Sequence, residues 1–310
     1  MQPGLIDQFE AERTRLVSLG YRLTGSFADA EDAVQESWLR LSAAPTDEIR
    51  DLRAWLTTVV SRLCLDRLKS AAKRRETYVG RWLHEPLVTA YSPVSGIASG
   101  DPLDAVVQDE DNRFAALVVL ETLTADQRVS FVLHDGFGMP FGEIAALLDI
   151  APAAARQHAS RARKITATSP APVPNQQHDE AVGRFLVAMA SGDISAVVAT
   201  LHPDAVVMGD ANGTTGTAVN VIHGAQKFAR FFLGLMKRYG EGSFDAMVPV
   251  RVNGQLGLAT SGWTGPTKRE SSPPRIAGFT VVDGLVYATY DIASPDKFAG
   301  VKLADWPVRP

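Results

Sequence analysis

The hydrophobic periodicity of the chain changes at the proline-rich segment 169–175 (SPAPVPN), and this change restricts the fold more than any other feature. Before it, apolar residues such as Leu16, Leu19 and Leu23 recur at three- and four-residue steps, which predicts amphipathic helices. After it, one helical pattern is followed by short β-type runs. We therefore expect a multidomain chain, with all-α domains first and an α+β domain last.

Composition excludes several classes of protein. With 310 residues, of which 45% are hydrophobic and 21% charged, the chain can form two or three packed units. No run approaches the roughly 18 apolar residues of a membrane-spanning helix. The single cysteine, Cys64, excludes an internal disulfide and a cysteine-based zinc site, so we expect a cytoplasmic protein.

Residues 140–164 predict a helix-turn-helix. An apolar face from Phe141 to Leu148 is followed by a short turn, and Pro152 suits the first position of a second helix. This second helix carries several basic residues, no acidic residue, and small residues that allow close packing. Such a layout is typical of a helix that enters the major groove of DNA. The alternative is a helical hairpin with a solvated basic face.

The second helix also carries the side chains that DNA recognition needs. Arg156 and Gln157 lie near its start, where arginine can pair with guanine and glutamine with adenine. The basic residues further along suit phosphates, which position a helix without reading sequence. The residues predicted to contact duplex DNA are Arg156, Gln157, Ser160, Arg161, Arg163 and Lys164.

A second basic segment ends the predicted helix that begins at Asp51. Its cations face only one acidic residue, Asp66, although the whole chain has a net charge of −4. A local cationic track of this kind suits melted, single-stranded DNA. The residues predicted to form it are Arg62, Arg67, Lys69, Lys73, Arg74 and Arg75.

The segments YRLTGSFADAEDAVQESWLRL and LRAWLTTVVSRLCLDRLKSAAKRR resemble region 2 of extracytoplasmic-function RNA polymerase sigma factors. ETLTADQRVSFVLHDGFGMPFGEIAALLDIAPAAARQHASRARK resembles region 4 of the same family. The resemblance implies two sigma domains that bind the β′ and β subunits of core polymerase and the −10 and −35 elements of promoters. It also implies that one helix docks on β′ through Asp29, Asp32, Gln35, Glu36 and Arg40.

HPDAVVMGDANGTTG, VIHGAQKFARFFLGL and FTVVDGLVYATYDIASPDKF look like a SnoaL-like domain, a cone with a curved antiparallel sheet. A sigma factor with this domain resembles the sigma factor J-like group, whose linker motif is matched here by Trp82, Leu83, Pro86 and Leu87. The resemblance implies regulation in cis, without a separate anti-sigma factor. This chain has Asp210-Ala211-Asn212-Gly213-Thr214 where the group carries a lysine after Asp-Gly-Gly-Gly, and Ser294 where the group has asparagine.

These observations predict five segments: region 2 (1–76), a linker (77–104), region 4 (105–168), a proline-rich linker (169–176) and the SnoaL-like domain (177–310). We expect a sigma factor involved in the stress response, with no catalytic residue, metal or cofactor. We also expect the linker motif to dock on the C-terminal domain and to fix the distance between the DNA-reading domains. Two alternatives remain. One is a stand-alone regulator whose C-terminal domain senses a small-molecule ligand; the other is an enzyme using His202, Asp204, Asp210 and His223.

Overall fold

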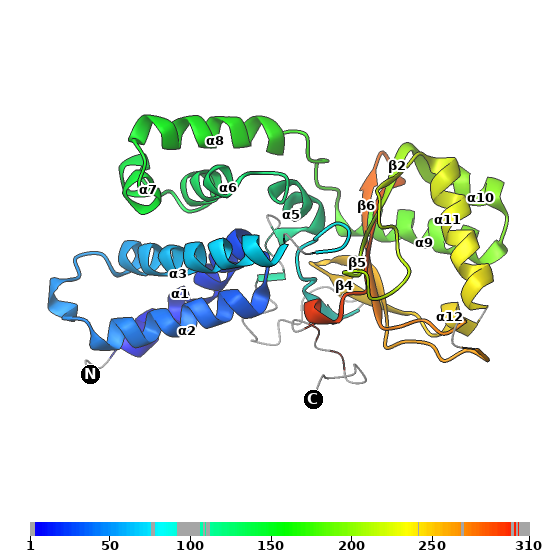
Figure 1. Cartoon of the computed structure of the whole chain (residues 1–310), viewed down its shortest axis with the longest axis horizontal. Coiled ribbons are helices and arrows are strands. Elements are labelled where there is room, and N and C mark those ends of the chain that lie inside the picture. The colour runs from blue at the N-terminus through cyan, green and yellow to red at the C-terminus, as the bar shows by residue number, and fades with distance from the viewer. Residues whose placement is uncertain are drawn as a thin grey trace. The chain divides into compact units, whose positions relative to one another are not determined.

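The computed structural model describes residues 4–75, 78–91, 106–107, 109, 112–240, 242–267, 270–298, 301 and 303. It divides the chain into two compact units (Figure 1). Unit 1 comprises Met1–Thr77 and Ala98–Ser169, and unit 2 comprises Tyr78–Ile97 and Pro170–Pro310. Each unit is therefore assembled from two separate stretches of the chain.

Three long helices open unit 1: α1 (Leu5–Thr24), α2 (Phe27–Ala43) and α3 (Leu52–Arg75), with the short 3-10 helix η1 (Thr46–Glu48) between the last two. Helix α1 ends at Gly25, which adopts a left-handed conformation (φ 73°). Helix α2 begins at Ser26, whose hydroxyl accepts a hydrogen bond from the Asp29 amide. The core between the helices contains Cys64, and burial raises the pKa of its thiol to about 12.

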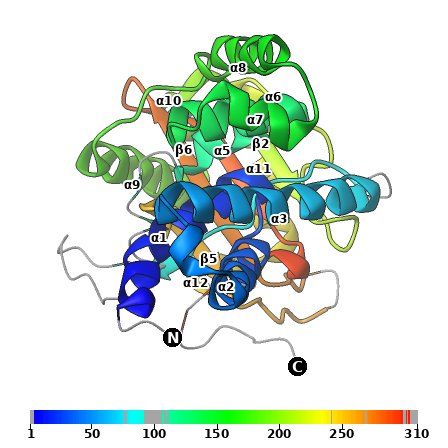
Figure 2. The ribbon, with the colours of Figure 1, turned by 90° about the vertical axis from the view of Figure 1, so that its left-hand side faces the viewer.

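Shorter helices complete unit 1: α5 (Phe114–Leu120), α6 (Ala125–Phe131), the π-helical turn η3 (Val132–Gly136), α7 (Phe141–Leu148) and α8 (Pro152–Thr166). Helices α6, α7 and α8 pack against one another and lie together on one side of the α1–α3 group (Figures 1 and 2). A capping box at Thr124 and Gln127 begins α6.

The two helical groups of unit 1 are joined by buried polar contacts. Arg128 of α6, only 3% exposed, donates a hydrogen bond of 3.2 Å to the carbonyl oxygen of Leu23 near the end of α1. The same guanidinium forms an ion pair of 2.9 Å with Glu121. The amide of Asn112 donates to the hydroxyl of Ser18 on α1 at 3.0 Å. These groups give up water for one another, so the contact favours one arrangement of the helices.

Unit 2 is the predicted α+β domain. A seven-stranded sheet has the order β1-β4-β5-β6-β7-β2-β3. Helices α9 to α12 lie along one face of the sheet (Figure 1), and apolar side chains of α9, α10 and α11 form the core with it. The strands are β1 (Val88–Ala90), β2 (Leu201–Asp210), β3 (Ile222–His223), β4 (Val248–Val252), β5 (Gln255–Thr260), β6 (Arg275–Val282) and β7 (Leu285–Ile292). The helices are α9 (Asn175–Ser191), α10 (Ile194–Ala199), α11 (Ala225–Tyr239), α12 (Gly242–Asp245) and the 3-10 helix η4 (Pro295–Lys297).

Two tight turns anticipated by the sequence join neighbouring strands. Asn253-Gly254 connects β4 to β5 and Asp283-Gly284 connects β6 to β7, with positive φ at all four residues. The structure adds a parallel pair, β2 with β7, so the sheet is mixed and open. A long crossover separates these two strands in the chain, which a parallel pair requires.

Candidate nucleic-acid interface and regulatory site

The helix-turn-helix is formed by α7 and α8. Asp149 adopts a left-handed conformation (φ 57°) that ends α7, and Pro152 lies in the first turn of α8. Ala155, Ala159 and Ala162 are buried on one face of α8. The opposite face of α8 is therefore free of helix packing and turned to solvent.

All six residues predicted to contact duplex DNA are exposed on α8. The guanidinium of Arg156 lies 6.0 Å from the centre of the Phe141 ring, which orients it near the helix start. Arg163 differs from the others because its Nε donates to Asp135 at 2.8 Å. That carboxylate partly neutralises Arg163, so it is less suited to a phosphate than Arg161 or Lys164.

The basic residues of α3 differ in their exposure in the structure. Arg62 and Lys69 are exposed, whereas Arg67 is partly buried and turned toward α2, 3.8 Å from Asp29 and 4.0 Å from Glu36. The side chains of Lys73, Arg74 and Arg75 lie outside the described residues. Arg67 therefore helps to join α3 to α2 in addition to any role toward DNA.

The residues predicted to bind polymerase also fall into two groups. Asp32, Gln35 and Arg40 are exposed, and Arg40 pairs with Glu36 at 2.6 Å. Asp29 and Glu36 are partly buried near Arg67. Asp32 and Gln35 line a groove of about 490 Å³ between α1 and α2. Two aromatic rings line this groove, those of Phe9 on α1 and Trp38 on α2, and they contact each other. The sequence did not reveal the groove because these two residues come from different helices.

The linker motif docks on the end of β2, in unit 2. Asp210 is fully buried there and accepts hydrogen bonds from the Tyr78 hydroxyl and, at 2.6 Å, from the Leu83 amide. The ammonium of Lys297 lies 2.5 Å from the Asp210 carboxylate and donates to the Leu83 carbonyl. It also lies 3.7 Å from the centre of the Trp82 ring. We call this group of five residues the Asp210 clasp.

A second contact continues the docking. The side-chain oxygen of Asn253 accepts a hydrogen bond from the main-chain N–H of Leu87 at 3.1 Å. In return, the main-chain N–H of Asn253 donates to the Leu87 carbonyl at 2.8 Å. Beyond it, Val88–Ala90 pairs with β4 as an edge strand. The sequence predicted a linker here, yet main-chain pairing with the sheet edge satisfies these backbone groups. Docking of the motif is thus observed, while its effect on domain spacing stays a prediction.

The electrostatics of the Asp210 clasp keep the Tyr78 hydroxyl protonated. Burial and the neighbouring Asp210 carboxylate raise the pKa of the Tyr78 hydroxyl. The group's lysine after Asp-Gly-Gly-Gly is absent at Thr214, but Lys297 supplies a cation to Asp210 from another part of the chain. The sequence shows Asp210 and Lys297 separately and gives no sign that they pair, since they are 87 positions apart.

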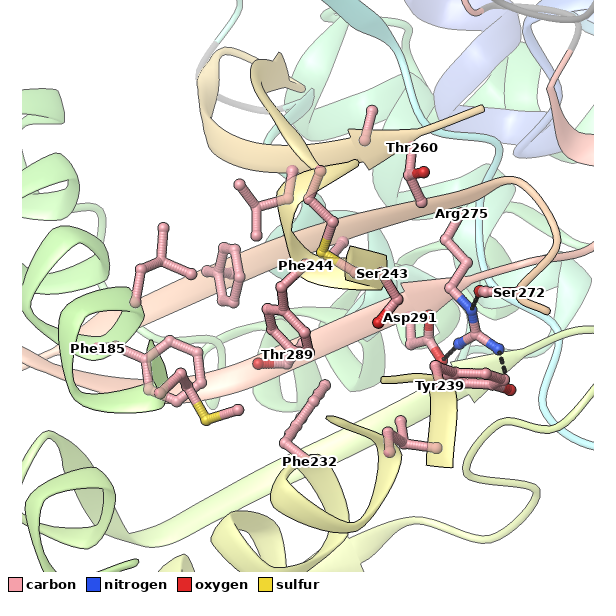
Figure 3. A pocket seen from close by; sticks show the side chains of 18 residues that line it. Phe185, Phe232, Tyr239, Ser243, Phe244, Thr260, Ser272, Arg275, Thr289 and Asp291 are labelled. Carbon is pink, nitrogen blue, oxygen red and sulfur yellow. Dashed lines mark hydrogen bonds and ion pairs between the residues drawn. The ribbon is translucent and has the colours of Figure 1, made fainter. Parts of the chain in front are cut away.

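A small cavity opens between α9, α11, α12 and the sheet (Figure 3). Its volume is about 60 Å³, and most of its wall is apolar, including Phe185, Phe232 and Phe244. At one end Arg275 pairs with Asp291 at 2.5 Å, and Tyr239 lies beside the guanidinium. Burial lowers the pKa of Arg275, but the Asp291 carboxylate outweighs it and raises the pKa. Arg275 therefore stays protonated.

The residues considered for catalysis do not converge. His202, Asp204 and Asp210 lie along β2, and strands rise about 3.3 Å per residue. His223 is exposed and pairs with Val206, while Asp210 belongs to the clasp. Within the described residues, no cluster of three or more His, Cys, Asp or Glu could hold a metal ion, and no helix is apolar enough over sufficient length to span a membrane.

Two helical modules, one of them with a helix-turn-helix whose second helix exposes basic residues, are typical of a DNA-binding protein. Comparisons with known proteins extend this. Residues 8–74 match Sigma-70 region 2, residues 113–165 match Sigma-70 region 4 and residues 182–289 match the SnoaL-like domain.

The chain is 54% identical over 308 residues to the ECF RNA polymerase sigma factor SigJ of Mycobacterium tuberculosis H37Rv, covering 98% of this chain and 96% of the relative. It is 37% identical to the probable ECF RNA polymerase sigma factor SigI of the same species, over 68% and 71% of the two chains. The crystal structure of SigJ superposes with a TM-score of 0.81 at 52% identity, covering 96% of this chain and 99% of that one. The chain therefore belongs to the extracytoplasmic-function RNA polymerase sigma factors.

Proposed function

We propose that α8 of this sigma factor reads the −35 element as duplex DNA, with Arg156 and Gln157 at the base edges and Arg161 and Lys164 on phosphates. The support is the exposed polar face of α8, opposite its three buried alanines. Ser160 lies on this face as well, and Arg163 plays a smaller part because of Asp135.

Region 2 supplies the other two contacts in this proposal. The end of α3, from Arg62 through Lys69 to Arg75, holds the melted −10 strand. The exposed side of α2, with Asp32, Gln35 and Arg40, docks on the β′ subunit, and Asp29 and Glu36 orient Arg67 behind it. Region 4 meets the β subunit. These partners place the protein in the cytoplasm, where core polymerase and chromosomal DNA are found.

The C-terminal unit, in this proposal, regulates the sigma factor in cis and takes the place of a separate anti-sigma factor. The observation that carries it is the Asp210 clasp, which binds the chain between the two DNA-reading regions to the SnoaL-like domain. A buried ion pair that also binds two main-chain groups favours one docked state, and its release would free the linker.

A second role follows from the cavity of unit 2. Its apolar wall and neutralised Arg275–Asp291 pair suit a small uncharged ligand better than a carboxylate. At about 60 Å³, the cavity is smaller than the ~150 Å³ site that accepts benzene in an engineered core. A larger ligand needs Met189 or Met247 to change rotamer, which methionine does readily. We propose no chemical reaction there.

The experiment that tests these roles is run-off transcription with bacterial core polymerase from the promoter of the protein's own operon. The full chain is compared with a version ending at Ser169 and with a full-length W82A/L87A variant. We expect transcription to require the chain, and both altered versions to change its level in the same direction, because both free the linker. Opposite effects would contradict regulation through the docked linker. Absence of core-polymerase binding would contradict the polymerase contacts.

A further inference from the structure

The exposed face of helix α11 in unit 2 carries only positive charges. Lys227, Arg230, Lys237 and Arg238 are all exposed, and the helix contains no acidic residue. At about 100° per residue these four side chains fall within an arc of about 100°, along roughly 16 Å of helix. The opposite face buries Phe228 and Ala229 in the core. We call the four exposed cations the α11 stripe.

One of the four cations opposes the local electrostatics of the helix. Lys237 and Arg238 lie in the last turn, where the helix dipole favours positive charge. Lys227 lies in the first turn, at the positive end of the dipole, and this turn has no acidic residue that would offset its charge. The exposed His223 precedes it. A cation that destabilises its own helix points to a use outside the fold.

The α11 stripe also lacks compensation from its surroundings. Among the described residues, the ion pairs of unit 2 involve His178, Arg251, Arg275 and Lys297, and none involves a member of the stripe. Arg238 lies 5.5 Å from the centre of the neighbouring Tyr239 ring, an interaction that leaves its charge intact. The full charge of the stripe is therefore available to an anionic partner.

We propose that the α11 stripe binds the phosphate backbone of DNA outside the −10 and −35 elements. The family places this chain on promoter DNA, which presents one negative charge per about 1.7 Å of helix axis, so the length of the stripe spans several phosphates. The whole chain has a net charge of −4, so attraction to DNA must come from local patches. The stripe contains only flexible lysine and arginine side chains. It is therefore better suited to binding phosphates than to reading bases. The C-terminal unit thereby becomes a third DNA contact, which goes beyond regulation in cis.

The test uses full-length protein assembled with core polymerase and a promoter fragment extended on both sides, with affinity measured against salt concentration. The main variant is K227Q/R230Q/K237Q/R238Q, since glutamine has nearly the helix propensity of lysine and arginine. The matched control is K227R/R230K/K237R/R238K, which keeps every charge. We expect the first variant to lose about tenfold or more in affinity and to lower the salt slope by about 3 to 4, because each phosphate contact contributes about 0.9. The control should match the unaltered protein.

Binding to core polymerase without DNA is measured in parallel. An unchanged salt slope would overturn the proposal and leave the stripe as a solvated surface. Loss of core-polymerase affinity with an unchanged slope would also overturn it, in favour of an acidic polymerase surface. A K227Q/R230Q variant guards against misfolding, because it keeps the helix propensity and removes one charge, that of Lys227, that opposes the helix dipole. It should unfold at an equal or higher temperature and lower the slope by about 2.

Discussion

Helix α8 of unit 1 and the buried ion pairs of unit 2 use charged residues in opposite ways. On α8 of unit 1, Arg156, Arg161, Arg163 and Lys164 are exposed, and among the described residues only Arg163 of these four pairs with a carboxylate. In unit 2, Arg275 and Lys297 are buried and each is paired with a carboxylate, Asp291 and Asp210. A buried charge without its partner is costly, whereas an exposed one is nearly neutral for folding. The comparison teaches that the exposed charges of α8 are suited to recognition, whereas buried pairs such as those of Arg275 and Lys297 hold a conformation.

The largest expected effect comes from removing one partner of a buried pair. The variant D210N leaves the Lys297 ammonium buried without a counter-charge, so we expect the free energy of unfolding of unit 2 to fall by about 3–5 kcal/mol. Denaturant unfolding followed by tryptophan fluorescence measures it, and proteolysis at Tyr78–Tyr91 should become faster. The D210N/K297M double variant should recover part of the loss. A fall below about 1 kcal/mol in D210N would show that the clasp does not hold the linker.

An intermediate effect is expected for an exposed charge on α8. R156A removes an exposed side chain, so the unfolding free energy should change by less than about 0.5 kcal/mol. Binding of the holoenzyme to its −35 element should weaken by about 1–3 kcal/mol, because a bidentate base contact is lost. Affinity for promoters with altered −35 bases should fall less. Equal loss of −35 binding and core-polymerase binding would mean that Arg156 supports the fold instead.

The smallest effect separates phosphate contacts from base contacts on the same helix. R161Q should weaken binding equally across −35 sequences and lower the salt slope by about 1. R163Q is the matched comparison, and its effect on the slope should be smaller because Asp135 already shares its charge. A larger change for R163Q than for R161Q would reverse the assignment of these two residues.

Local features were predictable from sequence and distant ones were not. Pro152, Asn253-Gly254 and Asp283-Gly284 lie where their own backbone preferences place a helix start and two hairpins, so nearby residues were enough to find them. The Asp210 clasp depends on tertiary contact between residues such as Leu83 and Asp210, which are 127 positions apart. The parallel pairing of β2 with β7 likewise joins distant strands, and no local pattern specifies it.

The contact between Arg128 and the Leu23 carbonyl has a consequence for binding equilibria. The −10 and −35 elements are separated by roughly 25 base pairs, about 85 Å of duplex at 3.4 Å per pair. In the proposed function, α3 holds the −10 element and α8 reads the −35 element, so helices that touch within unit 1 would have to separate before both elements are bound. The apparent dissociation constant would then be the intrinsic one divided by the open fraction. We therefore expect a change that weakens the Arg128 contact to raise promoter affinity, although Arg128 is not among the residues proposed to contact DNA.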